Sequence, residues 1–244
     1  MKSAFLILLV FLSGCGGADD ASTPAVAACV PHDPVVIQLF GDSTQAGYTT
    51  TLDGTSVIVA HNPADELQAY FTGLYGAGKV IVSSRAVGGT TAKELVAGTD
   101  HLNAPWPGSV MADIVVVNHG INDLTHDGAV LELDPDGYPK HVTILPEGLS
   151  SYRAALATLA KAPAVVIFET PNAVKVYDIA PYAQMMRDVA AEQGLAVADT
   201  YAFTVDKTDQ LSDWAHPTDA LYASIAAKVV EPVVGLVVAA LLCK

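Results

Sequence analysis

The stretch VVIQLFGDS, residues Val35–Ser43, decides the expected fold of this chain. Its first six residues are apolar apart from one Gln and rich in Val and Ile, which is typical of a buried strand. The run ends at Gly41-Asp42-Ser43, so a serine follows the carboxyl end of the strand, where α/β proteins bind their ligands. Asp and Ser are also common helix caps, and a purely structural role for both residues is the alternative at this point.

Strand and helix signals alternate along the rest of the chain. Further apolar strands are predicted over residues 79–83, 114–117, 165–168 and 195–198. Helices are predicted over residues 62–75, 92–97, 150–161 and 181–193, and from residue 218 onward. This alternation predicts an α/β fold in which a parallel sheet of five strands is covered by helices on both faces.

Two segments depart from this alternation. Residues 124–145 resemble an insertion, in which two β-rich arms flank the turn signal Asp134-Pro135-Asp136-Gly137 and predict a hairpin. The C-terminal helix is expected to kink or end at Glu231-Pro232. The apolar run Val233–Leu242 that follows is too short to span a bilayer, so we expect it to pack on the sheet.

The size and charge of the chain limit its organisation and its partners. Its 244 residues suffice for one sizeable α/β domain, but not for two ordinary domains and a linker. It carries 12 Lys and Arg against 26 Asp and Glu, a net charge of −14. Binding to a phosphate backbone needs a basic surface, so we exclude nucleic acid as a partner.

The N-terminus has the pattern of an export signal. Lys2 precedes the apolar run Ala4–Leu12, which is followed by the small residues before Cys15. The sequence Leu12-Ser13-Gly14-Cys15 resembles the lipobox of bacterial lipoproteins, in which the cysteine is lipidated and becomes the mature N-terminus. The alternative is plain secretion with cleavage after Ala25-Val26-Ala27, although that site lies far from the apolar run.

These signals set the expected domain boundaries. We expect a lipoprotein signal peptide over residues 1–14, a lipidated cysteine with a flexible tether over 15–33, and the folded domain over 34–244. The expected location is an exported lipoprotein, periplasmic or associated with the outer membrane, which contacts the membrane through its lipid anchor. If Cys15 carries lipid, Cys29 and Cys243 remain, and an oxidising compartment predicts a disulfide between them. Two unpaired cysteines are the alternative.

Residues with catalytic chemistry follow several of the predicted strands. These are Ser43, Gly89, Asn122 and the pair Asp213 and His216. A serine becomes a nucleophile when a histidine takes its proton, and a carboxylate then holds the histidine tautomer. Asp213 lies three residues before His216, so one tight turn can bring the two together. A backbone N–H at Gly89, the Asn122 amide and the Ser43 N–H are suitable donors to an oxyanion.

Taken together, four blocks resemble those of the SGNH (GDSL-type) hydrolase family. They are Gly41-Asp42-Ser43, Gly89, Gly120-Ile121-Asn122-Asp123 and Asp213-Trp214-Ala215-His216. The resemblance implies a three-layer α/β/α sandwich with a flavodoxin-like sheet, and a serine esterase without metal or cofactor. It makes Ser43 the nucleophile, His216 the base, Asp213 its orienting group, and Ser43, Gly89 and Asn122 the oxyanion hole.

Two assignments have rivals within the sequence. Gly88 is an alternative to Gly89 as the oxyanion donor, because the two glycines are adjacent. A second Asp-x-x-His pair, Asp123 and His126, also follows a predicted strand. The order of the family blocks and the Pro217 that follows His216 favour the pair Asp213 and His216.

The expected substrate is a short-chain ester, above all an O-acetyl ester of cell-surface or extracellular carbohydrate. A lipase, lysophospholipase or thioesterase is the alternative, because the same triad serves those reactions. An inactive binding lipoprotein on the same fold is the third hypothesis. The sequence leaves the natural ester and the oligomeric state open.

Overall fold

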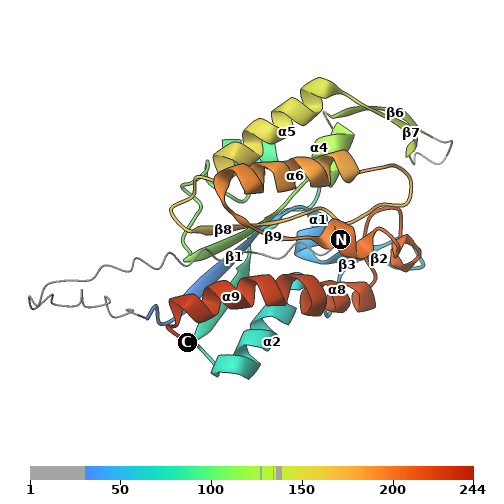
Figure 1. The fold of residues 1–244 in the computed structure, drawn as a ribbon. Helices are drawn as coiled ribbons and strands as arrows, with labels where there is room; N and C mark the ends of the chain where they lie inside the picture. Colours follow the sequence, from blue (N-terminus) through green and yellow to red (C-terminus); the bar gives the residue numbers. More distant parts are fainter. Residues whose placement is uncertain (1–30, 127, 134, 136–138) are drawn as a thin grey trace, which may run out of the picture.

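The computed structural model describes residues 31–126, 128–133, 135 and 139–244. In this part of the chain, a parallel sheet of five strands has the order β4-β1-β5-β8-β9. Helices cover both of its faces, so the predicted α/β/α sandwich is confirmed (Figure 1). The strands are β1 (Val35–Gly41), β4 (Val80–Ser84), β5 (Ile114–Asn118), β8 (Val165–Glu169) and β9 (Ala196–Ala198).

The strand predicted from VVIQLFG lies inside the sheet. β1 pairs in parallel with β4 on one side and with β5 on the other, so that Ile37 lies opposite both Val82 and Ile114. Successive side chains of a strand point to opposite faces. Ile37 and Leu39 accordingly belong to one apolar cluster, whereas Phe40 belongs to the other. Because both faces are covered, a nearly continuous apolar run is what this position requires.

Each face of the sheet is covered by its own group of helices (Figure 1). One group comprises α2 (Pro63–Tyr75), α8 (Asp219–Ile225) and α9 (Glu231–Leu241). The other comprises α3 (Ala92–Ala97), α4 (Ile121–His126), α5 (Pro146–Leu159) and α6 (Ala180–Gln193). Shorter helices lie between strands or loops: α1 (Ser43–Ala46), α7 (Thr200–Thr204) and the 3₁₀ turn η1 (Thr208–Gln210).

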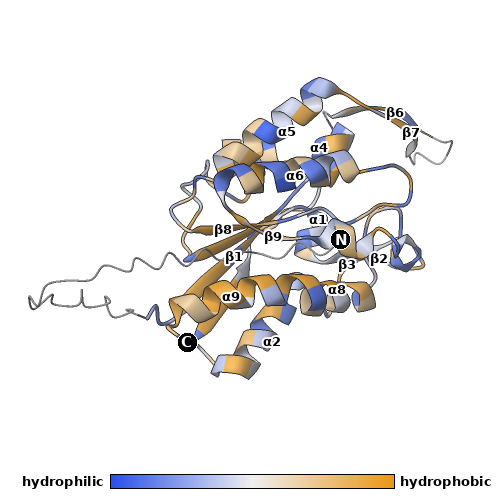
Figure 2. Ribbon diagram, viewed as in Figure 1, coloured by the Kyte–Doolittle hydropathy of each residue, from blue (hydrophilic) through white to orange (hydrophobic). Residues whose placement is uncertain are grey.

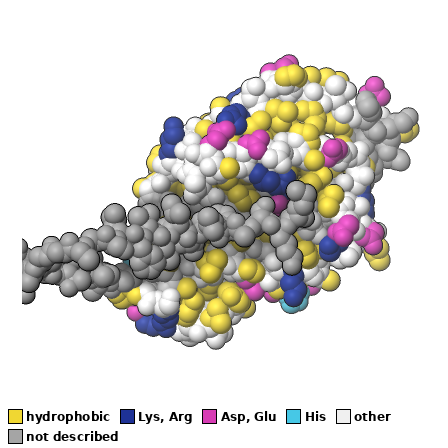
Figure 3. Space-filling view, viewed as in Figure 1, with side chains coloured by type: hydrophobic (Ala, Val, Ile, Leu, Met, Phe, Trp, Pro, Cys, Tyr) yellow, Lys and Arg dark blue, Asp and Glu magenta, His cyan; other side chains and the backbone are white. Residues whose placement is uncertain are grey.

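The C-terminal helix does not end at Pro232. The π-helical turn η2 (Ala226–Val230) joins α8 to α9. Pro232 lies in the first turn of α9, directly after this irregular turn, and proline has no backbone N–H to donate to it. Within the described residues, the resulting helix Asp219–Leu241 is by length and composition apolar enough to cross a membrane. Val234 and Val238 nevertheless pack in the core, as the sequence predicted, while Leu236 is exposed. Figure 2 shows the apolar character of α9, and hydrophobic side chains are visible on the same part of the surface in Figure 3.

Two antiparallel hairpins lie outside the main sheet. β6 (Ala129–Leu133) and β7 (Pro139–Ile144) form the hairpin that was predicted within residues 124–145. β2 (Tyr48–Thr50) and β3 (Ser56–Ile58) form a second hairpin, which is not among the elements predicted from the sequence. This second hairpin lies at the carboxyl ends of the strands, near α1 (Figure 1).

The predictions for the N-terminus fall on residues that the structure does not describe. The signal peptide, Cys15 and Cys29 all lie outside the described residues. The described chain begins beside the C-terminal helix, where the His32 N–H donates a hydrogen bond to the Leu241 carbonyl oxygen at 3.0 Å. The two ends of the folded domain therefore meet.

Candidate active site

Ser43 follows β1 directly and is the first residue of α1. Asp42 caps this helix, since its Oδ1 accepts hydrogen bonds from the Thr44 N–H at 2.9 Å and from the Thr44 hydroxyl at 2.8 Å. A side chain at position 41 would overlap the carbonyl oxygen of Asn118, so the turn requires Gly41. The structural role considered for this motif is therefore confirmed for Asp42, which acts as a helix cap. The Ser43 side chain is not used in this cap.

Ser43, His216 and Asp213 form one hydrogen-bonded chain. The Ser43 Oγ lies 2.8 Å from the His216 Nε2, and the His216 Nδ1 lies 2.7 Å from the Asp213 Oδ2. The other carboxylate oxygen, Oδ1, accepts the backbone N–H groups of Ala215 at 2.7 Å and His216 at 2.8 Å. Residues separated by 173 positions in the sequence thus meet in the order that proton transfer from a serine requires.

The surroundings of Asp213 keep its carboxylate ionised. Its partial burial would raise the pKa, but the hydrogen bonds from His216, Thr50 and the backbone N–H groups outweigh that effect. They hold the pKa of Asp213 well below its usual range. An ionised carboxylate at this position can stabilise an imidazolium ion on His216.

The chain of three residues opens into a hollow of about 290 Å³ at the carboxyl ends of the strands. Ser43, His216, Gly88, Gly89 and Asn122 line this hollow together. Gly89 has a φ of +78°, a conformation that favours glycine. The Asn122 Nδ2 donates one hydrogen bond to the Thr90 carbonyl oxygen at 3.2 Å, which fixes the amide beside the hollow. Both candidate glycines therefore line the hollow, and Gly88 is the one that lies against Ser43, since a Cβ at Gly88 would lie 3.6 Å from the Ser43 Cβ.

Comparison with known proteins agrees with this geometry. Residues 39–223 match the model of the GDSL-like lipase/acylhydrolase family. The chain belongs to this family. It is a carboxylic ester hydrolase of the GDSL-like acylhydrolases. No curated protein sequence matches it significantly.

Solved structures show the same fold at low sequence identity. A lipase/acylhydrolase from Enterococcus faecalis is 22% identical to this chain. The alignment covers 83% of this chain and 96% of the Enterococcus chain, with a TM-score of 0.58. Axe2, an acetylxylan esterase from Geobacillus stearothermophilus, is 19% identical, with coverages of 83% and 95% and a TM-score of 0.59. A second acetyl xylan esterase, AlAXEase, is 18% identical, with coverages of 80% and 97% and a TM-score of 0.55.

The rival Asp-x-x-His pair of this acylhydrolase is not assembled in the structure. The Asp123 carboxylate is buried and accepts the Ala92 N–H at 3.0 Å, at the start of α3. Burial raises the pKa of Asp123 to about 8. His126 is exposed and lines a different hollow with Thr91. Among the described hydrogen bonds, none joins Asp123 to His126, so this pair lacks the contact that a catalytic dyad needs.

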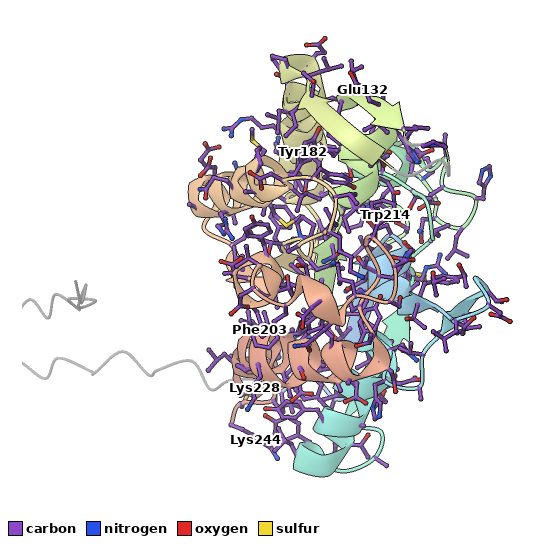
Figure 4. The ribbon with its side chains drawn as sticks, turned by 90° about the vertical axis from the view of Figure 1, so that its right-hand side faces the viewer. Glu132, Tyr182, Phe203, Trp214, Lys228 and Lys244 are labelled. Atoms are coloured by element: carbon purple, nitrogen blue, oxygen red, sulfur yellow. The ribbon has the colours of Figure 1, made fainter. Side chains whose placement is uncertain are left out.

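Several residues that line the hollow were not predicted from the sequence. Tyr48 and Ser56 line it from the β2–β3 hairpin, and Ile121 lines it from α4. Trp214 lines the hollow as well, and its ring centroid lies 5.8 Å from that of Tyr177. Figure 4 shows Trp214 near the strand ends. Asp53-Gly54, a common hairpin turn, was the signal that could have revealed β2 and β3.

Proposed function

We propose that this GDSL-like acylhydrolase is a serine esterase that removes short acyl groups, above all acetyl groups, from extracellular or cell-surface carbohydrate. The observation that carries the proposal is the continuous chain from Ser43 through His216 to Asp213, which opens into a small hollow. At about 290 Å³, this hollow lies at the lower end of the range for small-molecule sites. A short acyl group suits such a space better than a long one does.

In the proposed mechanism, the Ser43 Oγ attacks the ester carbonyl carbon while the His216 Nε2 takes its proton. Asp213 stabilises the resulting imidazolium ion, and the Ser43 N–H, the Gly89 N–H and the Asn122 amide stabilise the oxyanion. His216 then gives the proton to the departing alcohol oxygen as the carbon–oxygen bond breaks, which leaves an acyl group on Ser43. A water molecule, deprotonated by His216, releases the acid and restores Ser43.

A second hollow, which shares no lining residue with the hollow of Ser43, supports a carbohydrate as the alcohol portion of the ester. An open hollow of about 820 Å³ adjoins the β2–β3 hairpin. Most of the side chains that line it carry a hydroxyl or a carboxylate: Thr49, Thr50, Thr51, Asp53, Thr55, Ser212, Thr218 and Asp219. Such groups form hydrogen bonds with sugar hydroxyls. Two of the similar structures are acetyl xylan esterases by name, which supports the same substrate class.

Rates on nitrophenyl esters from acetate to palmitate, together with acetate release from acetylated xylan, test the proposal. We expect the acetate ester to be the best of the series and acetylated xylan to release acetate. A maximum at long acyl chains would instead support a lipase or thioesterase. Failure to hydrolyse any ester would refute the enzymatic proposal and favour a binding role.

We also propose that the enzyme is an exported lipoprotein, anchored through Cys15, whose ends are joined by a Cys29–Cys243 disulfide. The lipobox-like sequence supports the anchor. The hydrogen bond between His32 and Leu241 supports the disulfide, because these residues are near Cys29 and Cys243 in the sequence. Mass spectrometry of the unreduced protein should find the Cys29–Cys243 cross-linked peptide. Alkylation of both thiols in the native, exported protein would contradict the bridge.

A further inference from the structure

The β2–β3 hairpin reaches the acidic member of the hydrogen-bonded chain through Thr50. The Thr50 hydroxyl donates a hydrogen bond of 2.6 Å to the Asp213 Oδ2. This is the same oxygen that accepts the His216 Nδ1–H at 2.7 Å. The Asp213 Oδ1 accepts two backbone N–H groups, so each oxygen of this carboxylate has two donors. Of the four, Thr50 is the donor that comes from a distant part of the chain.

The hairpin holds the Thr50 hydroxyl in place. The Thr50 N–H donates to the Ser212 Oγ at 3.0 Å, and that hydroxyl donates to the His216 carbonyl oxygen at 3.1 Å. The Tyr222 hydroxyl of α8 donates to the Tyr48 carbonyl oxygen at 2.8 Å. The hairpin and the Asp213 loop are therefore joined at the backbone as well as through the Thr50 side chain. Both lie at the carboxyl ends of the strands, on the side of the molecule that is turned toward the viewer in Figure 4.

We propose that Thr50 is a positioning residue for the hydrolytic reaction: it fixes the Asp213 carboxylate in the orientation that keeps His216 aimed at Ser43. The inference rests on the proposed catalytic roles of these three residues. A carboxylate can rotate about its Cβ–Cγ bond, and a hydroxyl donor on Oδ2 restricts this rotation. Since small displacements of catalytic groups are costly to the rate, an anchored carboxylate favours turnover.

Steady-state kinetics of the full chain on nitrophenyl acetate test the role of Thr50. Thr50→Val should lower kcat about tenfold, the order expected for one hydrogen bond to a charged group, with KM unchanged. Thr50→Ser keeps the hydroxyl and should retain kcat. Thr158→Val is the matched control and should leave kcat unchanged, because the exposed Thr158 hydroxyl of α5 bonds to the Ala154 carbonyl oxygen within its own helix.

Several outcomes would overturn the inference. They are a wild-type kcat for Thr50→Val, an equal loss of kcat in Thr50→Ser, or a rise in KM alone. If Thr50→Val does not fold, Thr50→Ala serves the same comparison, with thermal melting as the check on folding. Absence of ester hydrolysis by the wild type would instead refute the proposed function, so the two failures are distinguishable.

Discussion

Glu169 offers a prediction about stability that can be worked out from the structure. It ends β8 and is only 4% exposed, and its Oε1 accepts the Thr200 hydroxyl at 2.9 Å. Burial raises the pKa of Glu169 from 4.5 to about 7, against the opposing effect of the hydrogen bond from Thr200. The nearby charge of Asp42 raises it further. Folding therefore favours the protonated form of this carboxyl.

The sign and size of the effect follow from proton linkage. A group whose pKa is raised in the folded state contributes its stability fully below pH 4.5 and loses it as the pH rises through about 7. A shift from 4.5 to about 7 corresponds to roughly 3 kcal/mol, because one pKa unit is about 1.4 kcal/mol. Glu169→Gln puts a side chain of nearly the same shape but without a charge at this position. Its free energy of unfolding should therefore not fall over this pH range as that of the wild type does.

Urea unfolding at pH 5 and pH 8.5 measures the difference. Between these two values, the free energy of unfolding of Glu169→Gln should gain about 2.5 kcal/mol relative to the wild type, because part of the full effect has already developed at pH 5. Asp123 also has a raised pKa, but it titrates in both proteins and cancels in the comparison, whereas the repulsion between Asp42 and Glu169 is part of the effect that is measured. Glu147→Gln, on the exposed side of α5, is the matched control and should show no such change. If the free energies of unfolding of the wild type and Glu169→Gln differ by the same amount at both pH values, the reasoning is refuted.

Two further predictions concern the site itself. His216→Ala should abolish ester hydrolysis, whereas His126→Ala should change it little, because His126 is exposed and lines a different hollow. The reverse pattern in kcat would make His126 of α4 the general base. Asn122→Ala should cost about 2.7–4 kcal/mol of transition-state stabilisation, as for one lost oxyanion donor, and kcat should carry the loss. A change in KM alone would make Asn122 a substrate-positioning residue instead.

The main sheet and the assembly of the catalytic residues were predictable because their signals are strong and local. An apolar run such as Val35–Phe40 fits few places other than a buried strand, and the following Gly41-Asp42-Ser43 marks a strand end. In a parallel sheet the carboxyl ends of all strands lie at one edge. Residues after different strands, such as Ser43 and Asn122, were therefore expected to converge, and the structure places both in one hollow.

The β2–β3 hairpin and the contact of Thr50 were not predictable in the same way. Each strand of this hairpin has three residues, and the hairpin is held largely by distant partners such as Tyr222 and Ser212. Sequence periodicity does not report contacts between residues more than 160 positions apart. Of the two outcomes predicted at Pro232, a kink or an end, the end is wrong, because the π-helical turn before the proline continues α8 into α9.

The most direct test of the central claim is the rate of nitrophenyl acetate hydrolysis by Ser43→Ala beside the wild type. The substitution removes one oxygen from the first turn of α1, so the thermal melt should match that of the wild type. We predict that kcat falls by about three orders of magnitude or more, because the serine and histidine of a triad act as a unit. A folded Ser43→Ala protein that keeps most of its activity would contradict the assignment of Ser43 as the nucleophile.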